Sequence, residues 1–316
     1  MTRIAFHSNQ LSLRGTEVAM YDYAHFNELL LGNTSLIITP RVAPHHEETA
    51  LRFATRFPVF GYSGKEELEA IIREQQVDIL YCIKSGQNDG ILSSTCKTVI
   101  HAVFGYCEPH GDVYAYVSEW LARQASQERF PAVPHIVAPL SVESGLRDDL
   151  GIPAEAIVFG RHGGAETFDL DFVHITVREL VRVREDLYFL FLGTDRFCDN
   201  HPQIIHLDAT SDLSRKARFI ATCDAMLHAR RSGETFGLAI AEFSSLGKPV
   251  FTFGQSHERA HLDILGKLAR IYDTADELTT LLWHFVPERH PRESPYATRY
   301  TPEAVMCRFQ EVFIEG

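Results

Sequence analysis

Short apolar runs alternate with stretches of helical periodicity along most of the 316-residue chain. Runs rich in β-branched and aromatic residues predict strands, and apolar positions three and four residues apart predict helices. In the first half we predict strands at residues 3–7, 35–39, 79–83, 98–103 and 113–117, and helices at residues 16–31, 65–74 and 119–127. This alternation is typical of a parallel α/β sheet.

A second series of the same kind begins after Pro139. It predicts strands at residues 157–161, 188–192, 204–206, 225–228 and 250–253, and helices at residues 167–183, 212–222, 237–246 and 275–285. The two series predict an α/β fold of two Rossmann-like, doubly wound domains, residues 1–138 and 151–287, facing a ligand-binding cleft. Apolar residues at helical spacing within residues 303–314 predict a terminal helix. We therefore expect residues 288–316 to form a tail that packs back across the domain junction.

Composition and charge narrow the class of protein. With 45% hydrophobic residues the chain has enough apolar material for packed cores, and 30 basic against 42 acidic residues disfavour nucleic acid as a partner. No run of apolar residues is long enough to span a bilayer, and the first residues lack a signal-peptide pattern. We expect a cytoplasmic protein and leave a weak peripheral association with membranes open. The six scattered cysteines predict reduced thiols.

The most informative segment is residues 225–251, where a buried strand, a loop with Gly233 and Gly237, and an apolar helix follow one another. Glu234 lies at the junction of loop and helix, and Glu242 lies eight positions later on an otherwise apolar helix face. A carboxylate on such a face requires a hydrogen-bonding or charged partner. An internal arginine, a backbone amide or the hydroxyl groups of a ligand would each meet this requirement.

A second segment, residues 157–168, predicts a strand that leads through Gly163 and Gly164 into a helix. Loop amides, a helix N-terminus and the guanidinium of Arg161 suit a diphosphate. The alternative for the two glycines is an ordinary turn between strand and helix.

These segments resemble the retaining glycosyltransferases of family 4, which have the GT-B fold and a Glu-x7-Glu signature. Glu234 and Glu242 match the signature, as do the flanking residues 233–238 and 246–250. The resemblance implies that Glu234 contacts hydroxyls of the transferred sugar and that Glu242 contacts the ribose. The donor-binding residues on this loop and helix start would be Gly233, Thr235, Phe236, Gly237 and Leu238.

The resemblance extends to the phosphate site with one departure. Gly160 and Arg161 match the family pattern, but Glu166 occupies the position of its phosphate-binding lysine. We therefore expect Arg161, the amides of Gly163 and Gly164, and Arg230 or Arg231 to share the diphosphate.

Matches in the first half are shorter. Gly15 and Thr16 resemble the family loop over diphosphate and acceptor, although a helix start capped by Thr16 explains them as well. His101, at a strand end, resembles a histidine near the donor sugar, and a structural role is its alternative. We expect Ser118 to cap a helix.

Two acidic clusters invite a metal-binding interpretation that the sequence does not favour. We expect residues 45–48 to form a solvated acidic loop. Asp169 and Asp171 are expected to lie at a helix start, where the helix dipole favours carboxylates, rather than to bind a metal.

The resemblance implies a retaining transferase. It would move a sugar from a nucleoside-diphosphate sugar to a hydroxyl of a glycan, a lipid-linked molecule or a small molecule, without a metal or another cofactor. Glu234, His101 and Arg161 are the candidate catalytic residues. The alternatives are a nucleotide-sugar epimerase of the same fold and a catalytically silent sugar-nucleotide-binding subunit, which Glu166 in place of lysine keeps open.

Overall fold

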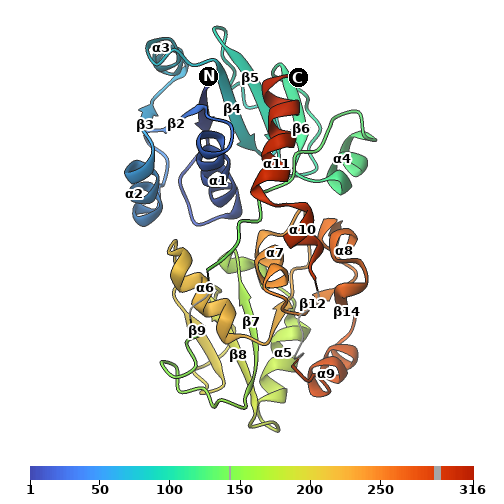
Figure 1. Ribbon diagram of the computed structural model, residues 1–316. Coiled ribbons are helices and arrows are strands. Elements are labelled where there is room, and N and C mark those ends of the chain that lie inside the picture. The colour runs from blue at the N-terminus through green and yellow to red at the C-terminus, as the bar shows by residue number, and fades with distance from the viewer. Residues whose placement is uncertain (142–143, 288–292) are drawn as a thin grey trace. The chain divides into compact units, whose positions relative to one another are not determined.

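The computed structural model describes residues 1–141, 144–287 and 293–316, which form two compact units (Figure 1). The first unit comprises Met1–Ala138 and Tyr300–Gly316, and the second comprises Pro139–Arg299. The sequence placed the end of the first domain at the same residue, 138. The second unit takes in the first part of the predicted tail, and the terminal helix belongs to the first unit.

The first unit is built on a six-stranded parallel sheet in the order β3-β2-β1-β4-β5-β6. Its strands are β1 (Arg3–His7), β2 (Thr34–Pro40), β3 (Val59–Tyr62), β4 (Ile79–Lys84), β5 (Lys97–Ala102) and β6 (Val113–Tyr116). Its helices are α1 (Gly15–Leu29), α2 (Glu47–Arg56), α3 (Lys65–Glu74), α4 (Glu119–Ser126) and α11 (Pro302–Phe309). The chain order reverses between β1 and β4, so that the carboxyl ends of these two strands form the switch point where α/β sheets bind ligands.

Helix α11 completes the core of the first unit (Figure 1). Thr301 caps its first turn and Pro302 occupies the first helical position, a residue type favoured there. The ring of Phe309 lies 5.4 Å from the rings of both Tyr23 and Tyr81, measured between centroids. The terminal segment therefore supplies aromatic side chains that bury one face of the first sheet.

The second unit repeats the architecture with the strand order β14-β12-β10-β7-β8-β9, again parallel. Its strands are β7 (Ile157–His162), β8 (Leu187–Leu192), β9 (Ile204–Leu207), β10 (Ala225–His228), β12 (Val250–Phe253) and β14 (Ala269–Tyr272), with a short pair formed by β11 (Gly233–Glu234) and β13 (Glu258–Arg259). Its helices are α5 (Asp171–Leu180), α6 (Leu213–Thr222), α7 (Leu238–Ser245), α8 (Ala260–Leu265), α9 (Ala275–Trp283) and α10 (Pro295–Arg299). The switch point of this sheet lies between β7 and β10.

The core of the second unit centres on Phe159, which stacks on Phe189 with ring centroids 5.6 Å apart. Phe251 and Phe285 contact the same ring edge-on and tilted, at 5.4 and 5.2 Å. These aromatic contacts come from strands β7, β8 and β12 and from the segment after α9. They hold the sheet rigid beneath the loops at its carboxyl edge.

Several local predictions were wrong. Residues 45–48 do not form a loop, because α2 begins at Glu47 with the His46 side chain accepting from the Thr49 amide. The sequence missed α2 and β3, since α2 buries only Thr49 and Phe53 and β3 is a half-exposed edge strand. It also missed α8, α10, β14 and the short strands β11 and β13. The predicted helix 167–183 is shorter, because a 3₁₀ turn at Ala165–Thr167 precedes α5.

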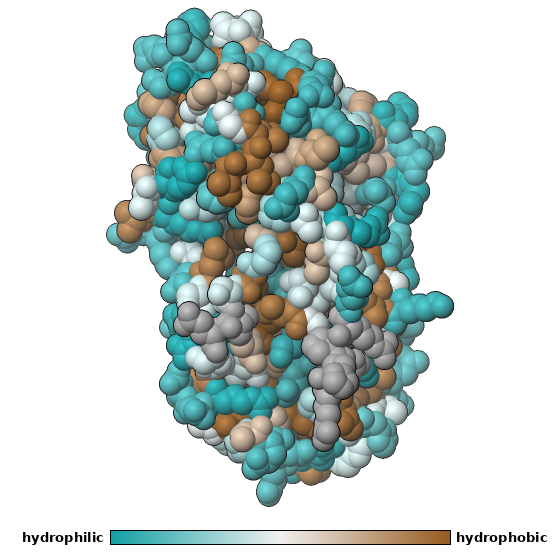
Figure 2. Space-filling model, viewed as in Figure 1, coloured by the Kyte–Doolittle hydropathy of each residue, from teal (hydrophilic) through white to brown (hydrophobic). Residues whose placement is uncertain are grey.

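The surface shown in Figure 2 is mainly hydrophilic, with hydrophobic residues in separate patches. Within residues 1–141, 144–287 and 293–316, no helix has the length and apolar character that crossing a membrane requires. The six cysteines are unpaired, as the sequence predicted.

Candidate functional site

Strands β7 and β10 lie next to each other and end at the carboxyl edge of the second sheet. Strand β7 ends in Arg161 and His162, while β10 ends at His228 and leads into the loop that carries Arg230 and Glu234. Ligands of parallel α/β sheets bind outside such a switch point. The fold therefore brings residues from two distant parts of the sequence to one polar edge.

Glu234 is held from two sides. Its Oε1 lies 3.2 Å from Nε2 of His228, and its Oε2 accepts from Nη1 of Arg230 at 2.9 Å. Burial raises the pKa of Glu234, but His228 and the charge of Arg230 outweigh burial and hold this pKa at about 2. The side chain retains 23% of its exposure, so an ionised carboxylate is available to a ligand.

A chain of hydrogen bonds behind Glu234 fixes its orientation. Thr252 Oγ1 lies 2.9 Å from Nδ1 of His228 and 3.1 Å from Nε2 of His261. If His261 donates to Thr252 and Thr252 donates to His228, then His228 carries its proton on Nε2 and donates to Glu234. Burial lowers the pKa of His261 to about 3, which keeps this ring neutral and consistent with that direction.

The carboxylate of Glu242 is paired with one lysine and one histidine side chain. Nζ of Lys216, on α6, pairs with Oε1, and Nε2 of His162 lies 3.0 Å from Oε2. Burial raises the pKa of Glu242, whereas Lys216 and His162 lower it to about 2. Of the partners that the sequence left open, a charged internal side chain is the one present, although it is a lysine and not an arginine. Oε2 makes no aligned hydrogen bond within the described part of the chain.

Arg161 is more enclosed than the sequence suggested. It is 4% exposed, and its two terminal nitrogens donate to Thr194 Oγ1, to the carbonyl of Gly164 and to Thr167 Oγ1. Burial lowers its pKa to about 10, so it stays charged at neutral pH. These hydrogen bonds brace the loop that contains Gly163 and Gly164 at the carboxyl edge of the second sheet. The negative charge of the nearby Glu166 also acts on Arg161.

The loop before α7 depends on Gly233. Its φ of +76° and the absence of a side chain let strand β11 pair with β13, because a Cβ atom there would lie 1.9 Å from the carbonyl oxygen of Glu258. Arg230 and Arg231 follow β10 in this loop. Arg231 is exposed, and its amide donates to Asp169 Oδ1 at 2.7 Å.

Helix α7 begins at Leu238 after Gly237, whose φ is +89°. The amides of its first turn lack intrahelical acceptors, and the helix dipole adds positive potential. The carbonyl of Phe236 accepts from the Tyr296 hydroxyl at 2.7 Å, which fixes the segment before the helix, including Thr235. The edge thus combines two ionised carboxylates with cations and oriented amides.

Comparison with solved structures finds proteins with the same fold. HepE of Anabaena in complex with UDP-glucose has a TM-score of 0.77 at 13% identity, with 100% of both chains covered. This chain has the GT-B fold. A glycosyltransferase from Rickettsia africae has a TM-score of 0.66 at 13% identity, with 99% of this chain and 93% of that chain covered. A Listeria monocytogenes protein described as a UDP-N-acetylglucosamine 2-epimerase has a TM-score of 0.63 at 11% identity, with 99% of this chain and 97% of that chain covered. No family model and no curated protein matches the sequence.

Three sequence-selected residues of this GT-B chain belong to the first unit. Gly15 begins α1 after Arg14, so Thr16 is not the helix cap, and the Thr16 hydroxyl instead donates to Glu17. His101 is fully buried, with its ring nitrogens 2.6 Å from the Tyr81 hydroxyl and 2.8 Å from the Val133 carbonyl. Of the two roles considered for His101, these contacts favour the structural one.

Other polar residues occupy the places that the sequence gave them. Ser118 caps α4 by accepting from the Leu121 amide, and Asp171 is the first residue of α5. Asp169 does not lie in the helix start as expected, because it precedes the cap residue Leu170 and accepts from the Arg231 amide. No group of three or more metal-ligating side chains occurs within the described ranges.

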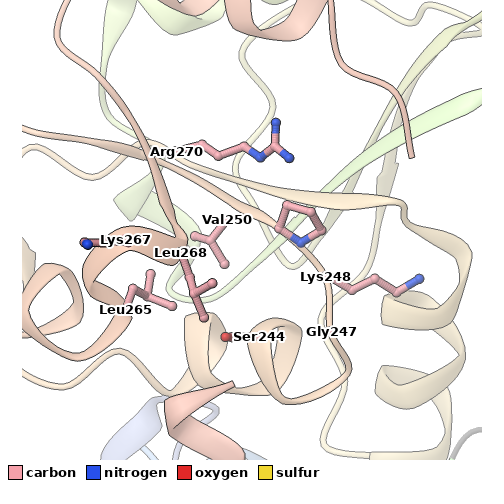
Figure 3. Close-up of a pocket in the computed structure, with 9 residues that line it drawn as sticks. Ser244, Gly247, Lys248, Val250, Leu265, Lys267, Leu268 and Arg270 are labelled. Atoms are coloured by element: carbon pink, nitrogen blue, oxygen red, sulfur yellow. The ribbon is translucent and has the colours of Figure 1, made fainter. Parts of the chain in front are cut away.

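A separate hollow of about 280 Å³ lies beside the starts of β12 and β14, at the opposite edge of the second sheet (Figure 3). Lys248 and Lys267 line it, but their side chains extend to opposite sides rather than toward one another. None of the site residues selected from the sequence lines this hollow.

Sequence reasoning missed His162, Lys216, His228 and His261. Two of them carried a usable signal, because His228 ends a predicted strand and His162 directly follows one, next to the motifs that were recognised. Lys216 and His261 lie in helices without a motif, and only the folded chain brings them to the carboxylates.

Proposed function

We propose that this protein is a retaining, metal-independent glycosyltransferase that uses a nucleoside-diphosphate sugar. The observation that carries the proposal is the pair Glu234 and Glu242, both held ionised at the switch-point edge of the second sheet. Two carboxylates, one buried and one half-buried, that neighbouring cations keep charged are suited to accept hydrogen bonds from sugar and ribose hydroxyls.

In this proposal Glu242 binds the ribose of the donor. Its side chain keeps 12% of its exposure, and a ribose hydroxyl donates to the carboxylate there while Lys216 stays paired with Oε1. Glu234 accepts from hydroxyls of the transferred sugar, and His228 keeps that carboxylate in place.

The reaction requires stabilisation of charge. As the carbon–oxygen bond to the diphosphate breaks, negative charge grows on the leaving phosphate and the sugar acquires oxocarbenium character. The first-turn amides of α7 and the charges of Arg230 and Arg231 would stabilise the phosphate, with Arg161 bracing the adjacent loop. The leaving phosphate then takes the proton of the acceptor hydroxyl on the same face of the sugar, which gives retention of configuration.

The complex of HepE with UDP-glucose supports a uridine nucleotide as the first donor to test. The experiment measures thermal unfolding with UDP, GDP, ADP and CDP and with their sugars. A ligand at a hundred times its Kd stabilises a protein by about 2.7 kcal/mol. We expect UDP and one UDP-sugar to raise Tm, and we expect sugar transfer to an added glycan with retained anomeric configuration. Failure of every nucleotide to raise Tm would overturn the proposal.

The epimerase alternative rests on the Listeria neighbour, which shares the fold. It predicts conversion of the donor sugar to its epimer in the absence of any acceptor. Nuclear magnetic resonance of the UDP-sugar pool distinguishes the two activities. A silent binding subunit would bind the nucleotide and produce neither change.

A further inference from the structure

The carboxyl edge of the first sheet carries exposed aromatic and amide side chains on two neighbouring loops. Residues 85–90 follow β4, and residues 103–112 follow β5, the adjacent strand. Phe104 and Tyr106 are 41% and 48% exposed, and Gln87 and Asn88 are also exposed. We call these four residues the aromatic shelf.

The two loops are joined by hydrogen bonds. The Tyr114 hydroxyl lies 2.8 Å from the Gly86 carbonyl oxygen and 3.1 Å from that of Tyr106. The amide of Asn88 donates to the Glu108 carboxylate at 2.9 Å. Gly86 has a φ of +105°, and a Cβ atom on it would lie 2.7 Å from the Tyr106 carbonyl oxygen, so this approach requires glycine. The backbones of the two loops are therefore fixed relative to each other before any ligand arrives.

An ion pair anchors the shelf to the switch point between β1 and β4. Lys84 ends β4 with a side chain only 4% exposed, and its Nζ lies 2.6 Å from Oδ1 of Asp89. Asp89 Oδ1 also accepts from the Ile91 amide. The second oxygen, Oδ2, accepts no hydrogen bond from the described residues and remains available for a hydroxyl donor.

This set of groups matches the two faces of a sugar. A pyranose ring presents weakly positive C–H groups, which the negative face of an aromatic ring attracts, and hydroxyls at its edge, which amides and carboxylates bind. The side chain of Gln87 has no partner in the described ranges, and the amide nitrogen of Asn88 is likewise unbonded there. We propose that the aromatic shelf, with Asp89, binds a carbohydrate, so that the acceptor of the transfer is a glycan.

The negative charge beside the shelf disfavours an anionic membrane as its occupant. Asp89 and Glu108 are exposed on the same two loops, and an anionic lipid surface would be repelled by them. The identification of this carbohydrate as the acceptor rests on the proposed glycosyltransferase function. The proposed binding of a sugar to the aromatic shelf does not depend on that function.

The test uses the full chain and a panel of defined probes: maltotriose, cellotriose and chitotriose, with binding followed by saturation-transfer nuclear magnetic resonance and titration. The variants are Phe104→Ala with Tyr106→Ala, and Asn88→Ala alone. Trp283→Ala on α9 is the matched control, because Trp283 is also 41% exposed and lies in the second unit. We expect at least one probe to bind the wild type and to lose about tenfold or more in affinity in the double variant, less in Asn88→Ala, and nothing in the control. The change in Tm with UDP should be the same in all four proteins.

Any of three results would overturn the proposal that the aromatic shelf binds a carbohydrate. Either no probe binds the wild type, or the double variant binds the probes as the wild type does. The third is that anionic vesicles bind the wild type and do not bind the double variant. Failure of the glycosyltransferase function looks different. In that case UDP and its sugars leave Tm of the wild type unchanged, while the oligosaccharide still binds and still depends on Phe104 and Tyr106.

Discussion

Nε2 of His228 lies 3.2 Å from Oε1 of Glu234, joining the last residue of β10 to the loop that precedes α7. The bond fixes the orientation of a carboxylate that Arg230 alone would leave free to rotate about its contact. His228 is therefore a positioning residue, and its effect on a reaction passes through Glu234.

Substitution of His228 should separate positioning from binding. We expect His228→Ala to lower kcat about tenfold to a hundredfold with a smaller change in KM for the donor, because the misplaced carboxylate matters most as charge develops. His228→Gln keeps a donor toward Glu234 and should recover part of the rate. The matched variant His101→Ala should lower Tm and leave kcat of the folded protein unchanged. Equal losses of kcat in both histidine variants would contradict this assignment.

Glu242→Gln should weaken binding of the free nucleoside diphosphate by about 1 to 3 kcal/mol, because a neutral amide replaces a charged acceptor for ribose hydroxyls. Isothermal titration measures the affinity, and Glu179→Gln on the exposed face of α5 is the control. An unchanged affinity in a folded Glu242→Gln protein removes this residue from the ribose site.

The phosphate loop should depend on Arg161 far more than on Glu166. Arg161→Ala breaks the hydrogen bonds to Thr194, Gly164 and Thr167 and should abolish most activity. Glu166→Ala should be mild, and Glu166→Lys should tighten donor binding by adding a cation. The test measures donor affinity and turnover for the three variants and for the wild type. If Arg161→Ala keeps both, the phosphate site lies elsewhere.

Activity should persist in excess EDTA, since the arginines and the amides of α7 supply the stabilisation of the leaving phosphate. The measurement is the rate of transfer or donor hydrolysis before and after chelation. Complete loss that Mn²⁺ or Mg²⁺ restores would show that a metal carries this charge, and Asp169 and Asp171 would be the first residues to substitute.

Glu258 should make the second unit less stable at higher pH. Burial raises its pKa from 4.5 to about 7, despite the charge of Arg230. Because the pKa in the folded state is the higher one, the stabilising effect is complete below about pH 4.5 and is lost as the pH rises through about 7. Glu258→Gln should therefore raise Tm at about pH 8 and change it little at about pH 5. Glu48→Gln, at the exposed start of α2, is the control, and a Tm shift independent of pH would refute the assignment.

The sequence by itself determined the two parallel sheets and the position of the Glu-x7-Glu helix. Both follow from local patterns: apolar runs set the strands, and the glycines and the helical spacing set the loop and α7. It also determined that Glu242 must have a partner, since a carboxylate on an apolar face is costly whatever the surrounding fold. Among the elements that it missed, α2 and β3 bury too few side chains to leave such a pattern. Helix α8 is buried but spans only six residues, too few to show helical spacing.

Only the tertiary structure decided which partners meet. Lys216 reaches Glu242 from 26 residues earlier in the chain, and nothing in the sequence around either residue specifies the other. His101 looked accessible at the end of its strand, but the ring of Phe313, from the far end of the chain, packs 5.2 Å from it and helps to close it into the core. Burial and pairing depend on contacts between segments distant in sequence, and such contacts exist only once the sheets and their covering helices have assembled.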